Sequence, residues 1–156
     1  MKSLRAPAVV ILAALILTAV AGAAATRGTP AEAKAMLDQA VAHYKDAGRK
    51  DALADFTAAK DPFHDRDLYV FCVASDHTIV ANGGYPAYVG TSADALVDSK
   101  GQPLGKALWD AAGKNANGSI EYPHFNPVTR KAEDKTTFYS KVADDLLCGV
   151  GAYSAH

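Results

Sequence analysis

Histidine residues are the first candidates for chemistry, because histidine serves both as a metal ligand and as a general acid or base. The sequence contains five of them, at His43, His64, His77, His124 and His156. No two are four residues apart, the spacing that places two ligands on one face of a helix. The GxSxG, P-loop and GxGxxG motifs of common enzyme and nucleotide sites are also absent from the sequence. We therefore expect no catalytic residue, no cofactor and no enzymatic activity.

One polar cluster could bind a cation. Asp65 and Asp67 follow His64 directly before a strand-like stretch. Carboxylates are suitable ligands for hard cations. A short polar segment in this position is more typical of a solvated turn, so we expect a turn and no metal site.

The first residues have the pattern of a signal peptide. Lys2 and Arg5 form a short basic stretch, residues 8–21 are apolar without a charge, and Ala23-Ala24-Ala25 offers the small residues of a cleavage site. We expect residues 1–25 to be removed and the mature protein to be periplasmic or secreted. A retained membrane anchor is the alternative, because the apolar run is nearly long enough to span a bilayer.

The remaining chain, residues 26–156, is long enough for one domain, with its core in about residues 30–153. The formal net charge is -1 for the full chain, and removing Lys2 and Arg5 makes it -3. A mildly acidic chain without a basic patch is a poor partner for nucleic acid or anionic lipid. No second apolar segment follows, so we expect no membrane span after signal cleavage.

The two cysteines, Cys72 and Cys148, are an even pair behind an export signal. This combination favours a disulfide, since disulfides persist beyond the cytoplasmic membrane. Two buried free thiols are the alternative. No CxxC, CxxCH or zinc-type spacing occurs, which excludes thioredoxin-like, haem and zinc sites as motif-based interpretations.

The order of elements predicts an α+β domain with an antiparallel sheet. A helix begins at Thr29-Pro30-Ala31-Glu32, where a cap, a first-turn proline and a capping-box glutamate coincide, and ends at Gly48. A short helix over about 51–59 follows. Later segments are predicted from their apolar patterns and turn residues: strands at 67–75, 78–82, 119–125, 135–143 and 145–153, a glycine-rich loop at 83–90 and a helix at 105–113.

Three segments resemble the single Cache domain family of extracytoplasmic sensor domains: "DLYVFCVASDHTIVANGGYPAYVG", "DSKGQPLG" at 98–105, and "EYPHFNPVTRKAEDKTTFYSKVADDLLCGVGAY". The resemblance covers about residues 30–153. It implies a PAS-like fold, with a long N-terminal helix packed on a curved antiparallel sheet and a small-molecule pocket on the other side of the sheet.

The resemblance also implies that the first and last strands are central neighbours. Cys72 and Cys148 would then lie on adjacent strands, within reach of a disulfide. If they share a face, then Gly149 and Gly151 lie on the opposite one, together with Tyr69, Phe71 and Tyr153. We expect a ligand, or the pocket that holds it, to use the space that the two glycines leave. The alternative is that the N-terminal helix needs this clearance.

A pocket for a small polar molecule needs apolar walls and a few convergent donors. Lys135 occupies a lysine position of the family's hairpin and is the first candidate for a charged donor. Its alternative is a solvated hairpin lysine, and each aromatic candidate could instead serve packing. Asn82, Phe138 and His124 differ from the residues that relatives often carry there, namely histidine, tyrosine and tryptophan. The full set of expected ligand-binding residues is Lys135, Tyr122, His124, Tyr88, Tyr85, Asn82, Phe138, Tyr69, Phe71 and Trp109.

These features predict a small-molecule-binding sensor domain without an output module of its own, with an organic anion among the expected ligands. A sensor that ends just after its last strand needs a partner, such as a membrane receptor or sensor kinase. One alternative is a structural or interaction module whose pocket its own side chains fill. A hydrolase or lyase on the same sheet is a second alternative, for which the sequence offers no nucleophile or metal site.

Overall fold

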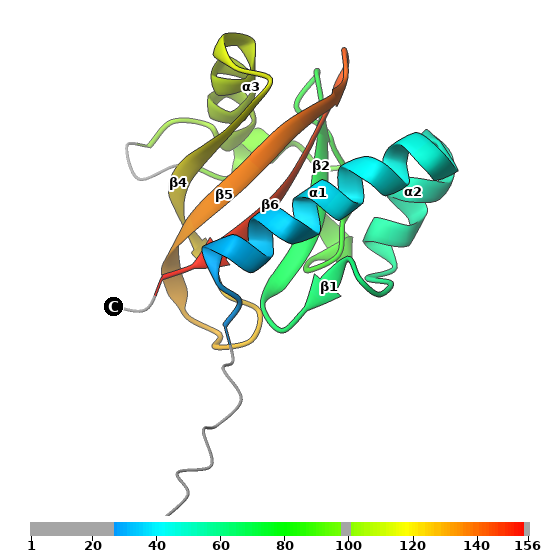
Figure 1. The fold of residues 1–156 in the computed structure, drawn as a ribbon. Helices are drawn as coiled ribbons and strands as arrows, with labels where there is room; N and C mark the ends of the chain where they lie inside the picture. Colours follow the sequence, from blue (N-terminus) through cyan, green and yellow to red (C-terminus); the bar gives the residue numbers. More distant parts are fainter. Residues whose placement is uncertain (1–26, 98–100, 155–156) are drawn as a thin grey trace, which may run out of the picture.

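The computed structural model describes residues 27–97 and 101–154. The expected signal segment, residues 1–25, lies outside these ranges. Figure 1 shows the helices against one sheet, in an α+β arrangement. In chain order the elements are α1 (Pro30–Ala47), α2 (Arg49–Thr57), β1 (His64–Asp65), β2 (Leu68–Ala74), β3 (Ile79–Asn82), two short 3₁₀ helices η1 (Pro86–Tyr88) and η2 (Ala93–Ala95), α3 (Leu104–Lys114), β4 (Asn117–Phe125), β5 (Ala132–Ala143) and β6 (Leu146–Tyr153).

Local sequence signals set both ends of α1. The Thr29 side chain accepts a hydrogen bond from the Glu32 backbone N–H, and the Glu32 carboxylate accepts one from the Thr29 N–H, which is the expected capping box. Gly48 ends the helix with φ of 80°, a conformation that glycine adopts without a steric penalty. Because α2 starts at the next residue, the two helices form a bend that Gly48 permits.

The sheet is antiparallel, and its strand order in the described residues is β1-β2-β6-β5-β4; β3 also pairs with β2, on the edge away from β6. Strands β2 and β6 are therefore central neighbours, as the family resemblance implied. Cys72 pairs directly with Cys148 in their register, and the two form a disulfide across 76 residues of chain. The expected disulfide is confirmed, and the alternative of two free thiols is wrong.

The two faces of the sheet carry separate hydrophobic cores. Helices α1 and α2 cover the face that contains the disulfide, as Figure 1 shows for α1 across β6 and β5. The other face is covered by α3 and by the loops that contain η1 and η2. Alternation along the central strands places Leu68, Val70, Val150 and Ala152 with the disulfide. The expected division of side chains between the faces is thus confirmed.

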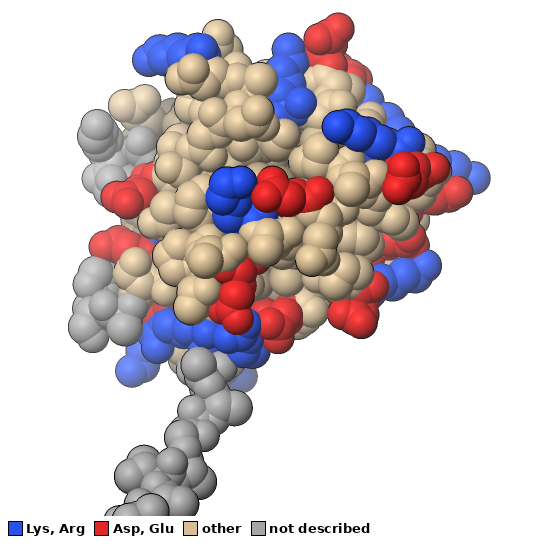
Figure 2. Space-filling model, viewed as in Figure 1, with Lys and Arg blue, Asp and Glu red and all other residues tan. Residues whose placement is uncertain are grey.

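Charges of both signs are interspersed on the face shown in Figure 2, without a continuous basic patch. Within residues 27–97 and 101–154, no helix is long and apolar enough to cross a membrane.

Candidate functional site

Gly149 and Gly151 lie on the face opposite α1, and neighbouring side chains of the sheet use their space. A Cβ at Gly149 would lie 2.9 Å from Cζ of the Phe71 ring. A Cβ at Gly151 would overlap the Lys135 side chain, which crosses the sheet at this point. The alternative that α1 needs the clearance is wrong, because α1 packs on the disulfide face. The glycines instead let Phe71 and Lys135 lie flat against the sheet.

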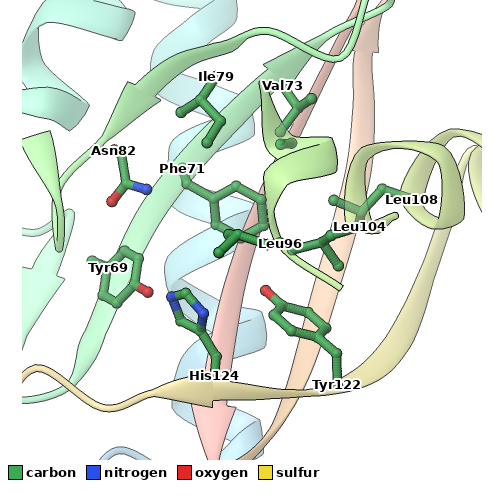
Figure 3. Close-up of a pocket in the computed structure, with 11 residues that line it drawn as sticks. Tyr69, Phe71, Val73, Ile79, Asn82, Leu96, Leu104, Leu108, Tyr122 and His124 are labelled. Carbon is green, nitrogen blue, oxygen red and sulfur yellow. The ribbon is translucent and has the colours of Figure 1, made fainter. Parts of the chain in front are cut away.

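A partly open cavity lies beside these two side chains, between the sheet, the loops and α3 (Figure 3). The volume open to the centre of a water molecule is about 20 Å³, enough for one water. Five expected site residues meet there: Tyr69, Phe71, Asn82, Tyr122 and His124. The remaining wall is apolar and consists of Val73, Ile79, Ala93, Leu96, Leu104 and Leu108.

Lys135 lies directly behind the cavity wall, with 1% of its surface exposed. Its Nζ donates a hydrogen bond of 2.8 Å to the Tyr69 hydroxyl. Three rings surround the rest of the amine, with centroids 4.0 Å away for Tyr69, 4.7 Å for Tyr153 and 5.9 Å for Phe71. Burial lowers the pKa of Lys135 to about 7, and the Asp67 carboxylate opposes this decrease. The alternative of a solvated hairpin lysine is therefore wrong.

The Tyr69 hydroxyl connects this amine to the cavity. It accepts the Lys135 hydrogen bond and lies 3.3 Å from the Tyr153 hydroxyl, which donates to the Phe125 carbonyl at 3.0 Å. Since the Tyr153 proton goes to the Phe125 carbonyl, Tyr69 is the donor in the hydrogen bond between the two hydroxyls.

Asn82 and His124 offer further polar atoms to the cavity. The Asn82 Oδ1 atom accepts from the N–H groups of Gly84 and Tyr85, at 3.1 and 2.8 Å, which directs the amide. Its Nδ2 has no hydrogen-bond partner within the described part of the chain, and the same is true of both ring nitrogens of His124. Burial, and to a lesser extent the positive charge of Lys135, lowers the pKa of His124 to about 3, so its ring is neutral at neutral pH.

Tyr85 and Tyr88, expected as parts of a lid, stack on each other at 5.1 Å beside the cavity. The Tyr85 ring also contacts the rings of Tyr69 and His124, and its hydroxyl donates to the Phe125 carbonyl. This contact connects the loop with β4 across one side of the cavity. Neither tyrosine forms part of the cavity wall itself.

Two expected site residues lie elsewhere. Phe138 is on the disulfide face, where it lines an open hollow beside α1 together with Leu37 and Val41. It cannot contact a ligand in the cavity beside α3, because it points to the opposite side of β5 from Lys135. Trp109 packs at the edge of the pocket-side core and donates from Nε1 to the Ala74 carbonyl at 2.8 Å. Trp109 thus fixes α3 to the end of β2.

The sequence interpretation missed a buried polar network next to Lys135. Asp67, expected in a solvated turn, has no exposed surface and accepts hydrogen bonds from the Gly28 N–H at 2.6 Å and from Asn126 Nδ2 at 3.0 Å. Asn126 also donates to Glu133, which forms an ion pair with Arg27. The solvated-turn expectation is therefore wrong for Asp67. Among the residues that the structure describes, no group of three or more His, Cys, Asp or Glu side chains could hold a metal ion.

Comparison with known proteins gives consistent results. The family model described as Single Cache domain 2 matches residues 8–155. Similar solved structures include a methyl-accepting chemotaxis protein from Vibrio parahaemolyticus, with 21% identity, a TM-score of 0.65 and coverage of 79% of this chain and 86% of the other. A periplasmic sensor domain of a chemotaxis protein has 16% identity, a TM-score of 0.59 and coverage of 80% and 90%.

A third similar structure is a Cache chemosensory domain described for its recognition of carboxylic acids. Its identity is 13%, its TM-score 0.57 and the coverage 80% of this chain and 88% of the other. No curated protein matches the chain. At these identities the structural matches establish the shared PAS-like sensor fold.

Proposed function

The chain belongs to the Single Cache domain 2 family, and from this membership we propose that it is an extracytoplasmic sensor domain whose cavity beside α3 binds a small organic anion. Cache domains are ligand-binding sensors rather than enzymes. The finer assignment, an anion in this cavity, rests on the side chains that surround it.

The observation that carries the proposal is the buried amine of Lys135 behind the Tyr69 hydroxyl. A protonated amine in a site with little water attracts an anion much more strongly than it would at the surface. The Asn82 amide and the neutral His124 ring can each donate a hydrogen bond from the adjacent walls. Converging donors of this kind suit the two oxygens of a carboxylate.

The size of the cavity favours a very small ligand. A space for one water is too small for a carboxylate with several carbons. The walls must therefore move on binding, and the loops that carry Tyr85 and Leu96 are better able to move than the paired strands. Carboxylic acid recognition by a structurally similar Cache domain supports the choice of short carboxylates as the first probes.

We further propose that the mature protein acts outside the cytoplasm after removal of residues 1–25. A sensor domain of this kind then reports its ligand through another protein, such as a membrane receptor or sensor kinase. Crosslinking in intact cells should capture such a receptor. Repeated failure to enrich any membrane protein would contradict this part of the proposal.

One observation favours a second function. Since the cavity is nearly filled by its own side chains, the domain could serve as a structural or interaction module with no ligand. Thermal-shift and calorimetric titrations with acetate, propionate and pyruvate distinguish the two. A ligand present at a hundred times its Kd should stabilise the protein by about 2.7 kcal/mol.

The control ligand is propionamide, which has the shape of propionate without its charge. Binding of propionate but not of propionamide, and its loss in Lys135→Met, supports the anion sensor. No binding of any carboxylate in the panel favours the module without a ligand.

A further inference from the structure

We propose that the cavity takes up its organic anion together with a proton, which the Lys135 amine accepts. This inference rests on the proposed function and adds a pH dependence to it. It predicts that the sensor responds to the anion more strongly in acidic than in alkaline surroundings, and that Asp67 sets the pH at which the response decreases.

The geometry around Nζ disfavours a permanent charge in the empty protein. Of the three possible N–H bonds of an ammonium group, one reaches the Tyr69 hydroxyl, while the aromatic rings of Tyr69 and Tyr153 lie against the amine. Aromatic faces attract a cation, but they replace only part of its lost hydration. No carboxylate of the described residues forms an ion pair with Nζ. The amine therefore has reason to be neutral until an anion arrives.

The charged and titratable groups that face this amine come from each neighbouring element. On β2 and β6 these are Tyr69 and Tyr153, on β4 Tyr122 and His124, and on the adjoining loop Tyr85. Burial raises the pKa of each tyrosine and lowers that of His124, so all five are neutral at neutral pH. None of them can supply the charge that would fix the proton on Lys135.

Two carboxylates complete the surroundings. Asp67 raises the pKa of Lys135 through its charge, but its oxygens already accept from Gly28 and Asn126. Glu133 points to the same side of β5 as Lys135, and its charge is paired with Arg27. Among the acidic groups of the described residues, Asp67 is thus the one whose charge raises the pKa of Lys135.

An anion in the cavity adds a second negative charge near Nζ and raises the pKa of Lys135 above its value of about 7 in the empty protein. Below the lower pKa, the amine is already protonated and binding takes up no proton. Between the pKa values of the empty and occupied states, binding takes up about one proton and the affinity falls about tenfold for each pH unit. Above both values the amine is neutral in both states, and affinity no longer depends on its proton.

Calorimetric titration of the intact mature protein with propionate tests the inference without a mutation. At about pH 8, titrations in two buffers with different ionisation heats should show an uptake of about one proton, and at about pH 5.5 an uptake near zero. Propionate binding whose affinity is the same at both pH values, with no proton exchanged, would overturn the inference and leave the anion sensor intact. Absence of propionate, acetate and pyruvate binding at every pH would instead overturn the proposed function.

Asp67→Asn sharpens the test, since it removes the charge and keeps an oxygen for the Gly28 N–H. The pH at which propionate affinity begins to fall should decrease in this variant, because the amine loses the carboxylate whose charge raises its pKa. If the variant does not fold, as circular dichroism would reveal, NMR titration of the lysine ε-carbon signals in the unaltered protein replaces it. One lysine should titrate near neutral pH and move to a higher pKa with propionate; a protein in which every lysine titrates near its ordinary value overturns the inference.

Discussion

On the face of the sheet that α1 and α2 cover, the core is mainly apolar and includes the disulfide, with Ser140 beside Cys148 as a buried polar residue, whereas the opposite face combines aromatic rings with several buried polar groups. Lys135, Thr137 and Asn82 belong to this second face. Apolar groups need only close packing to be stable when buried, but a buried polar group needs a hydrogen-bond partner. Among the described residues, no fully buried side-chain nitrogen or oxygen lacks a partner, so the unpartnered Asn82 Nδ2 and His124 ring nitrogens are atoms that solvent or a ligand can reach from the cavity. This difference supports the proposal that the second face binds the ligand, while the first maintains the fold.

The largest effect should come from a large side chain on the disulfide face. Phe56 has no exposed surface, and its ring meets that of Phe63 edge to face at 4.8 Å. Phe56→Ala should lower the free energy of unfolding by about 3–5 kcal/mol, measured by urea denaturation. The matched control is Phe125→Ala, at a ring that is 47% exposed, with an expected change within about 0.5 kcal/mol. Equal losses in the two variants would contradict this assignment of the core.

The disulfide should come next. Replacing Cys72 and Cys148 together by alanine should lower the free energy of unfolding by about 2–4 kcal/mol, because the bridge closes a long loop in the unfolded chain. The bridge lies on the face away from the cavity, so the affinity for propionate should stay the same at a temperature where the variant is folded. A large loss of affinity in the folded variant would show that the two faces are not separate in function.

Much of this architecture could be predicted from the sequence, because the responsible signals are local. The capping box at Thr29 and Glu32 and the glycine at Gly48 define α1 within a few residues. The family resemblance brought Cys72 next to Cys148, and the two-residue period of a strand then assigned the neighbours of both cysteines to faces.

The same period could have corrected one site residue. Lys135 and Phe138 are three residues apart on β5, so they must point to opposite faces, and only one of them could reach the cavity. The prediction grouped them because it followed the family's hairpin rather than the alternation within it.

The polar network at Asp67 had no comparable signal. Its partners Gly28 and Asn126 are 39 and 59 residues away in the chain, and their hydrogen bonds depend on how the sheet brings distant segments together. A polar residue before a strand is usually solvated. Only the assembled fold shows that Asp67 is buried and close enough to influence Lys135.

A smaller effect is expected at Gly151, where one added methyl group would crowd the side chains of the cavity face. Gly151→Ala would place a Cβ against the Lys135 side chain and 2.5 Å from Thr137 Oγ1, with an expected loss of about 1–3 kcal/mol in the free energy of unfolding. Displacing Lys135 should also weaken propionate binding. Gly113→Ala is the control, because its Cβ meets nothing within 4 Å near the end of α3, and it should stabilise the protein by up to about 1 kcal/mol. A neutral Gly151→Ala variant with normal affinity would contradict the proposed position of Lys135.

The smallest change in stability, counted per pH unit, should come from the charge of Lys135 itself. Its pKa is about 7 in the folded protein, against an ordinary value of 10.5. Between these values the unfolded chain binds a proton that the folded protein does not, so the contribution of Lys135 to stability rises with pH, by about 1.4 kcal/mol per unit at most. Lys135→Met retains an unbranched apolar stem without a charge, and the variant should lack this rise. Its stability relative to the wild type should therefore be greatest near neutral pH and decrease towards about pH 9.5.

Urea denaturation of both proteins at a series of pH values measures this difference directly. Lys141→Met controls for the loss of a lysine from the same strand, at a site that is partly exposed to solvent. Parallel stability curves for the wild type and Lys135→Met would mean that the buried amine keeps its proton throughout this range. Such a result would leave the cavity with a permanent cation, and a ligand would then gain the same attraction from Lys135 at every pH tested.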